Sequence, residues 1–184
     1  MRRDAEDRRD ALIAAAHDCF RDSGYLVPLE DIAHRAGVGR GTLYRNFPDR
    51  LALAIAVFER EIARLESEVL PNAAPADLLE RRMVLAARPY ALAFRLADMK
   101  REPDARARFA HLEARAIEMW RPLVERAKEA GVLREDVSIG QVMTISRIIG
   151  GLVTADDDDE AIAQTVLPMW RLIVDGLKPR TTGT

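Results

Sequence analysis

The chain has 184 residues, of which 48% are hydrophobic and 32% are charged, and its formal net charge is −2 at pH 7. These values fit one or two small folded domains. The overall charge is too close to neutral to attract nucleic acid. A surface that binds nucleic acid would therefore have to come from local clustering of basic residues. No apolar run of about 18 residues is present and the charged N-terminus has no apolar signal segment, so we expect neither a membrane span nor secretion.

Apolar residues recur at three- and four-residue spacing along most of the chain, and no segment shows the two-residue alternation of a strand. The sequence therefore predicts an all-α fold with about nine helices. Prolines should end or kink two of them, at Pro89 and at Pro122. The expected helices span residues 4–22, 29–36, 40–47, 49–70, 76–87, 90–100, 103–130, 138–153 and 158–177.

These helices divide the chain into three segments. Residues 1–48 hold three short helices, and residues 49–74 hold a connecting helix followed by a proline-bounded linker. Residues 75–184 hold a larger helical bundle. We expect two domains joined by the connecting helix.

The stretch from Leu29 to Phe47 has the pattern of two short helices joined by a tight turn. Gly37 can adopt the positive φ that a sharp helix exit requires. In the second helix, Leu43 and Phe47 form an apolar pair at i, i+4 spacing. The other faces of that helix carry residue types that bind phosphates and base edges, namely Arg40, Gly41, Thr42, Tyr44, Arg45 and Asn46. The stretch therefore has the features of a DNA-binding helix-turn-helix.

The sequence LEDIAHRAGVGRGTLYRNFPDRLAL resembles the DNA-binding domain of the TetR family of bacterial transcriptional regulators. The resemblance covers residues 9–57 and rests on several separate positions, which are Ile32-Ala33, Ala36-Gly37-Val38, Gly41, Thr42-Leu43-Tyr44 and Phe47. The rest of the chain resembles the family in length and helix count only. The resemblance implies a homodimer, usually a repressor, that binds a palindromic double-stranded DNA operator and is released by a small-molecule inducer. Residues 1–48 would then bind DNA, and residues 75–184 would bind ligand and form the dimer. The lone Cys19 cannot form an internal disulfide, so we expect a reducing, cytoplasmic setting.

The resemblance also implies a role for each exposed residue of the second helix. Arg40 and Gly41 begin the recognition helix and should meet base edges in the major groove, with Arg45 as a second base reader. Arg50, which stands where the family usually has lysine, should bind a phosphate. The residues expected to bind phosphates within the helix are Thr42, Tyr44 and Asn46.

Some positions depart from the family pattern. Pro28 and Leu29 stand where a pair of threonines often begins the preceding helix, and Gly39 replaces a common serine, so hydroxyl caps are missing at both places. Asn46 replaces a common histidine. Glu30 lies near the DNA side and either accepts a hydrogen bond from a cytosine amine or repels phosphate. These departures leave the operator sequence undefined.

The last two predicted helices are apolar over most of their circumference. Such helices need more than one neighbour to cover them, and a four-helix bundle built from two copies would do so. We therefore expect a homodimer whose interface residues are Val142, Ile145, Ile149, Leu152, Leu167, Trp170 and Val174.

Methionine and aromatic residues are spread over the helices between the linker and the last pair. Such residues can line an adaptable apolar pocket, although each of them can equally be plain core. We expect Phe94, Met119 and Trp120 to line a pocket for the inducer.

The sequence contains no arrangement typical of an enzyme or of a cofactor site. No serine, histidine and aspartate group or cysteine and histidine pair stands in a plausible context, so we expect no catalytic residue, no cofactor and no metal. Cys19 fits a small core residue, with a redox sensor as the alternative. The acidic run at residues 156–159 fits a helix N-terminus better than a metal site.

The alternative to a regulator is a helical protein-interaction module with a helix-turn-helix core that reads no operator.

Overall fold

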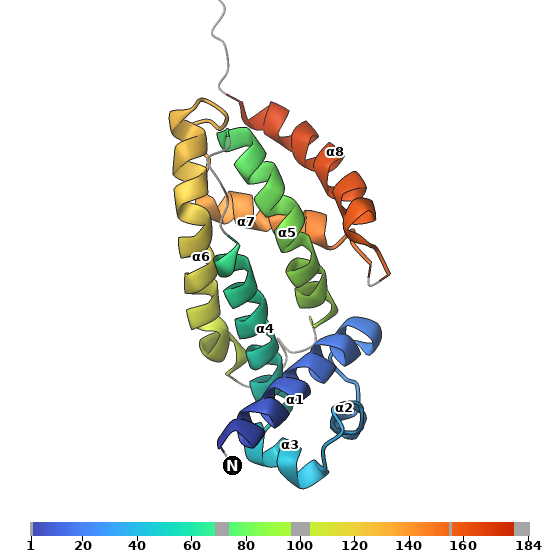
Figure 1. Ribbon diagram of the computed structural model, residues 1–184. Helices are drawn as coiled ribbons and strands as arrows, with labels where there is room; N and C mark the ends of the chain where they lie inside the picture. The colour runs from blue at the N-terminus through green and yellow to red at the C-terminus, as the bar shows by residue number, and fades with distance from the viewer. Residues whose placement is uncertain (1, 69–73, 97–103, 155, 179–184) are drawn as a thin grey trace, which may run out of the picture. The chain divides into compact units, whose positions relative to one another are not determined.

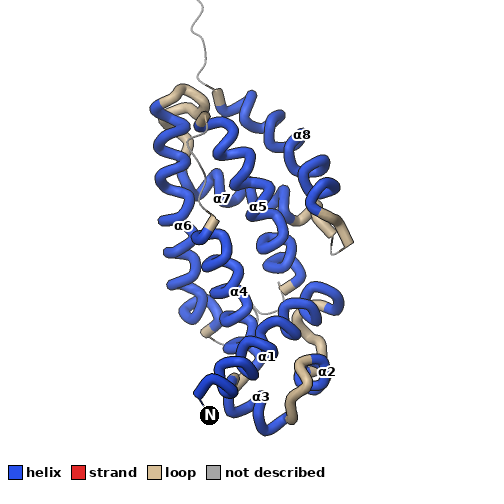
Figure 2. Tube along the Cα trace, viewed as in Figure 1, coloured by secondary structure: helices blue, strands red, loops and turns tan. Residues whose placement is uncertain are grey.

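The computed structural model describes residues 2–68, 74–96, 104–154 and 156–178, and within these ranges it contains helices and no strand (Figure 2). The predicted all-α fold is therefore confirmed. The described residues form the helices α1 (Arg2–Ser23), α2 (Leu29–Arg35), α3 (Arg40–Asn46), α4 (Arg50–Ser67), α5 (Pro75–Arg95), α6 (Ala105–Glu129), α7 (Ile139–Gly150) and α8 (Asp159–Leu177) (Figure 1).

Helix α5 differs from the sequence prediction, which placed two helices at residues 76–87 and 90–100. It runs without interruption through Pro89, and the residues predicted to continue it beyond Leu96 lie outside the described residues. Buried apolar residues stand on both sides of the proline, including Ala86, Ala87 and Leu92. Packing of this continuous apolar face outweighs the hydrogen bond that proline cannot donate.

Contacts between residues divide the chain into two compact units. The first unit comprises residues 1–63 and 92–112, and the second comprises residues 64–91 and 113–184. This division differs from the predicted segments, because it groups the end of α5 and the start of α6 with the first three helices.

The core of the first unit is built by α1, α2, α3 and the first part of α4, together with the end of α5 and the start of α6. Helix α1 contacts α2, and α2 contacts α3. On α1, the predicted stripe of Leu12, Ala16 and Phe20 is fully buried. Gly37 has a φ of 68°, and the next amide, of Val38, donates to the carbonyl of Ala33 at 3.0 Å. The turn therefore has the left-handed exit that the sequence predicted, and it fixes α3 against α2.

The second unit has its own core, formed by parts of α5 and α6 together with α7 and α8. Trp120 and Trp170 are its largest fully buried side chains. Helix α7 approaches α5 closely at Gly150, where an added Cβ would lie 2.5 Å from Cβ of Tyr90. Only glycine fits there without a shift of the neighbours.

The N-termini of α7 and α8 are both capped. Ser138 and Gln141 form a reciprocal capping box at the start of α7. Asp158 caps α8 by accepting a hydrogen bond from the amide of Ala161 at 2.8 Å. The acidic run therefore supplies a helix cap, and the described residues contain no group of histidine, cysteine or acidic side chains suited to a metal ion.

Candidate nucleic-acid interface

Helix α3 has one buried face and one exposed face. Leu43 and Phe47 are almost fully buried, as their i, i+4 spacing predicted. Tyr44 keeps 46% of its surface exposed, and Arg40, Gly41 and Arg45 are also exposed. The helix is therefore fixed by its apolar side while its polar and basic side chains face solvent.

Arg40 forms an ion pair with Glu30 across the helix-turn-helix. Its Nη2 lies 2.5 Å from Oε1 of Glu30, and the two side chains are 70% and 45% exposed. An exposed ion pair contributes about 0–1 kcal/mol, so DNA can compete for the guanidinium. Glu30 therefore orients Arg40 in the free protein and also lowers the positive charge at the start of α3.

The remaining polar side chains of α3 are linked along the helix. Nη2 of Arg45 donates to Oγ1 of Thr42 at 3.1 Å, and Nδ2 of Asn46 donates to the carbonyl of Thr42 at 2.8 Å. Thr42 and Asn46 are half-buried. These contacts restrict the directions in which Arg45 and Asn46 can point.

Arg9 of α1 contacts the end of α3, a role that the sequence analysis missed. Its Cζ lies 4.5 Å from the ring centroid of Phe47, and Nη1 donates to the carbonyl of Asn46 at 3.4 Å. The guanidinium thus covers the aromatic ring and binds an unpaired helix-terminal carbonyl. No local sequence signal connects two residues 37 positions apart.

Arg50 has internal partners that differ from the phosphate expected for it. Its Nη1 donates to the carbonyl of Tyr25 at 2.7 Å and to the carbonyl of Val27. Its Cζ lies 5.6 Å from the ring centroid of Tyr25. The side chain is half-buried, and its contacts hold the start of α4 to the connection between α1 and α2.

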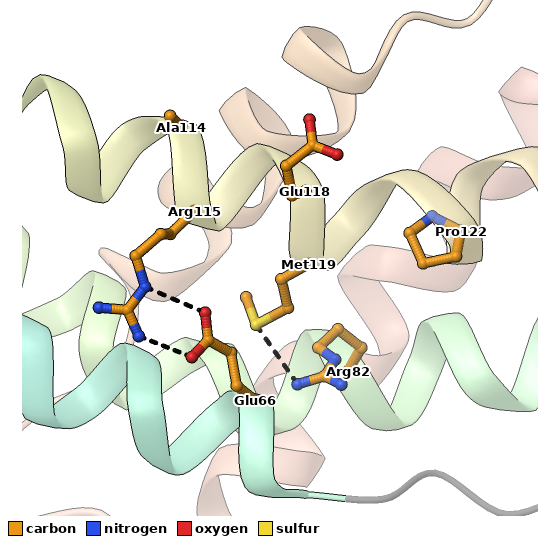
Figure 3. A pocket seen from close by; sticks show the side chains of 7 residues that line it. All are labelled: Glu66, Arg82, Ala114, Arg115, Glu118, Met119 and Pro122. Atoms are coloured by element: carbon orange, nitrogen blue, oxygen red, sulfur yellow. Dashed lines mark hydrogen bonds and ion pairs between the residues drawn. The ribbon is translucent and has the colours of Figure 1, made fainter.

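The three residues predicted to line a ligand pocket have different environments. Met119 lines a hollow of about 530 Å³ in the second unit (Figure 3). Trp120 is fully buried in the core and does not line this hollow. The side chain of Phe94 lies outside the described residues.

The predicted dimer residues also separate into different environments. Val142, Ile149 and Trp170 are buried in the core of their own chain, which removes them from the surface that a partner could contact. Ile145, Leu167 and Val174 are half-buried, and Leu152 is exposed. The other large apolar side chains exposed on α7 and α8 are Ile148, Met169 and Leu172. Because both helices are apolar on most sides, sequence periodicity did not distinguish the inner face from the outer face.

A helix-turn-helix whose second helix exposes basic and polar side chains is typical of DNA-binding transcriptional regulators. The described residues contain no helix long and apolar enough to cross a membrane. Residues 12–57 match the family described as bacterial regulatory proteins of the tetR family, and residues 70–179 match the C-terminal domain of SbtR-like transcriptional regulators. The chain belongs to the TetR family.

Solved structures agree with this assignment. The TetR transcriptional regulator SCO0520 from Streptomyces coelicolor is 31% identical, with a TM-score of 0.67 over 94% of this chain and 99% of that one. A TetR regulatory protein from Mycobacterium vanbaalenii is 29% identical, with a TM-score of 0.66 over 97% and 99%.

A curated relative matches part of the chain. The HTH-type transcriptional activator FasR from Mycolicibacterium smegmatis is 40% identical over 65 residues, which is 35% of this chain and 30% of that protein. The chain thus aligns with less than a third of this relative.

Proposed function

We propose that this protein is a ligand-responsive repressor that binds a palindromic operator as a homodimer and is released by a small-molecule inducer. The observation that carries the proposal is the exposed face of α3, where Arg40, Tyr44 and Arg45 stand on a helix anchored by the buried Leu43 and Phe47. A rigid helix with such a face suits the major groove, which admits one helix.

Arg40 and Arg45 are the base readers in this proposal. Both are exposed, and an arginine can donate two hydrogen bonds to O6 and N7 of guanine. Gly41 has no side chain, and an added Cβ there would meet nothing within 4 Å. The glycine therefore allows the helix backbone to approach the bases, and Thr42, Tyr44 and Asn46 bind phosphates beside it.

The second copy is proposed to pack against α7 and α8. These two helices contact each other, and large apolar side chains are exposed on them and just after α7, namely Ile148, Leu152, Met169 and Leu172. Exposed apolar residues grouped on adjacent helices favour association with another protein surface. A two-fold dimer presents two copies of α3, so its operator should be an inverted repeat.

The second unit is proposed to receive the inducer. Release from DNA requires that the inducer bind the DNA-free conformation more tightly than the DNA-bound one. A ligand with equal affinity for both conformations would not change their populations. Repression follows if the operator overlaps the promoter, because the bound dimer then blocks transcription.

Selection of binding sites from random duplexes tests this function with the full chain. The expected result is enrichment of an inverted repeat whose half-sites are separated by about one helical turn or a multiple of it. Enrichment of a single half-site would contradict the proposal that a homodimer binds an inverted repeat. Absence of any enriched sequence would support the alternative, a helical protein-interaction module that reads no operator. A promoter reporter then separates a repressor from an activator.

A further inference from the structure

The hollow in the second unit contains a buried cation. It lies among the end of α4, the first part of α5 and α6 (Figure 3). Arg82 of α5 lines it and is only 6% exposed, and it is the only buried charged residue in the described parts of the chain. A buried charge is costly unless a partner of opposite charge compensates it.

The contacts of Arg82 are with neutral groups. Its Nη1 donates to the carbonyl of Leu65 at 2.7 Å and lies 3.6 Å from Sδ of Met119, a weak acceptor. Its Nε has no hydrogen-bond partner among the described residues. Burial lowers the pKa of Arg82, and the charge of Glu68 raises it. Arginine stays protonated in such surroundings, so the positive charge remains.

The acidic side chains that line the hollow already have cationic partners. Glu66 accepts from Nε and Nη2 of Arg115 at 3.2 and 2.6 Å, as Figure 3 shows. Glu118 lies 2.7 Å from Arg121. They are therefore not the missing partner of Arg82.

Other arginines of the second unit show what the missing partner would be. Arg171 holds Glu80 through Nε and Nη2, both at 2.8 Å, and Arg115 holds Glu66 through the same two nitrogens. In Arg82, the Nε side of the guanidinium has no such carboxylate among the residues that the structure describes. The buried arginine thus lacks the bidentate partner that its more exposed counterparts have.

We propose that this hollow binds a small organic carboxylate whose head group pairs with Arg82 and whose apolar part lies along Ala114, Met119 and Pro122. The proposal rests on the proposed function, since it gives the chemical class of the inducer. A volume of about 530 Å³ suits a small molecule. Met119 has the flexible thioether that can turn away as the carboxylate reaches the guanidinium.

The charge of the ligand follows from the charges around the hollow. One cation lacks a paired carboxylate, while Glu66, Glu68 and Glu118 lie at or near the site. A head group with a single negative charge balances Arg82. Arg115 and Arg121 already neutralise Glu66 and Glu118, so a doubly charged phosphate would bring one more negative charge than Arg82 offsets, in the neighbourhood of Glu68.

Calorimetry with octanoate and 1-octanol, titrated into the full chain at neutral pH, tests the proposal. The two probes differ in head-group charge and share the same chain length. We expect saturable binding of octanoate at least about tenfold tighter than that of octanol. Equal affinities, or the absence of saturable octanoate binding, would overturn the proposal. Octyl phosphate is expected to bind more weakly than octanoate, and tighter binding would overturn the assignment of a carboxylate.

Variants identify the residue responsible. Arg82→Gln should abolish the preference for octanoate over octanol, whereas Arg121→Gln, which removes an exposed arginine beside the hollow, should preserve it. Persistence of the preference in folded Arg82→Gln would contradict the proposal. If Arg82→Gln does not fold, Arg82→Lys takes its place. Arg82→Lys should keep the charge preference and lose affinity because the bidentate geometry is lost. Loss of the preference in Arg82→Lys would count against the proposal.

These titrations contain no DNA, so they separate this proposal from the proposed function. If octanoate binds through Arg82 but no ligand releases DNA, the carboxylate site is supported and the proposed release by an inducer is contradicted. If a neutral compound releases DNA and octanoate does not bind, the release by an inducer is supported and the carboxylate site is contradicted.

Discussion

Arg50 at the start of α4 donates a hydrogen bond of 2.7 Å to the backbone carbonyl of Tyr25, and its guanidinium also lies over the Tyr25 ring. A residue that family resemblance assigned to phosphate binding is thus part of the internal structure of the helix-turn-helix unit. The contact satisfies a carbonyl in the connection between α1 and α2, where no helix hydrogen bond is available.

Arg50→Ala should therefore destabilise the protein more than a surface substitution does. Loss of hydrogen bonds from a charged donor to two carbonyls should lower the free energy of unfolding by about 1.5–3 kcal/mol. The measurement is urea denaturation, with Arg45→Ala as the control, since its side chain is exposed and the change should stay within about 0.5 kcal/mol. Unchanged stability of Arg50→Ala together with weaker binding to every DNA sequence would support the phosphate role instead.

Glu30 should weaken DNA binding in the wild-type protein. Glu30→Gln frees Arg40 from its ion pair and removes a negative charge near the phosphates, so affinity for the operator should rise several-fold at low salt. Asp31→Asn removes the same charge one residue along α2 and serves as the control. Fluorescence anisotropy with labelled operator provides the affinities. A fall in affinity specific to Glu30→Gln would instead assign Glu30 to base recognition.

Asp49 should make the first unit sensitive to acid. Its burial raises the pKa of the carboxyl, but hydrogen bonds from Arg108 and from the amide of Ala52 outweigh that effect and hold the pKa below the usual 3.8. A lowered pKa in the folded state contributes stability that is complete above 3.8 and is lost as the pH falls through the lowered value.

Asp49→Asn isolates the charge, because asparagine still caps a helix. The variant should lose at most about 1 kcal/mol at neutral pH, since the ion pair with Arg108 is partly exposed. Its stability should also decline less than that of the wild type as the pH is lowered. Denaturation curves recorded over a pH series measure both effects, and parallel acid profiles for the two proteins would show that Asp49 does not carry the dependence.

Ile148→Asp should convert the proposed dimer into a monomer. Ile148 is 65% exposed in the single chain, so the charge costs little in the isolated fold and becomes unfavourable only when a partner covers it. Ile148→Val keeps the apolar contact and should remain dimeric. Sedimentation at several protein concentrations distinguishes these states. A dimer of unchanged stability in Ile148→Asp would place the interface elsewhere.

Local sequence predicted the DNA-binding part well because its determinants are local. A positive φ at Gly37 and the buried pair Leu43 and Phe47 depend on residues within one or two helical turns. Partners distant in sequence were not predictable in this way. Arg9 contacts Asn46 and Phe47, and Arg50 contacts Tyr25, only because the fold brings them together.

Predictions for the second unit were limited by its apolar composition. Trp120, proposed for a pocket, and Trp170, proposed for an interface, are both core residues, since aromatic character alone does not show which way a side chain points. The buried Arg82 was missed because its sequence neighbours are typical of an exposed helix face. Its burial follows from contacts with Leu65 and Met119, which lie on other helices.

The central claim, that the exposed face of α3 binds DNA, is tested most directly by operator affinity measured over a salt series for the wild type, Arg45→Ala and Arg64→Ala. Arg64→Ala removes an arginine outside the helix-turn-helix and controls for total charge. We predict that the logarithm of the wild-type association constant falls steeply and linearly with the logarithm of salt concentration. We also predict that Arg45→Ala lowers operator affinity by about 1–3 kcal/mol while Arg64→Ala does not. Binding that is insensitive to salt, or equal for Arg45→Ala and the wild type, would contradict the claim.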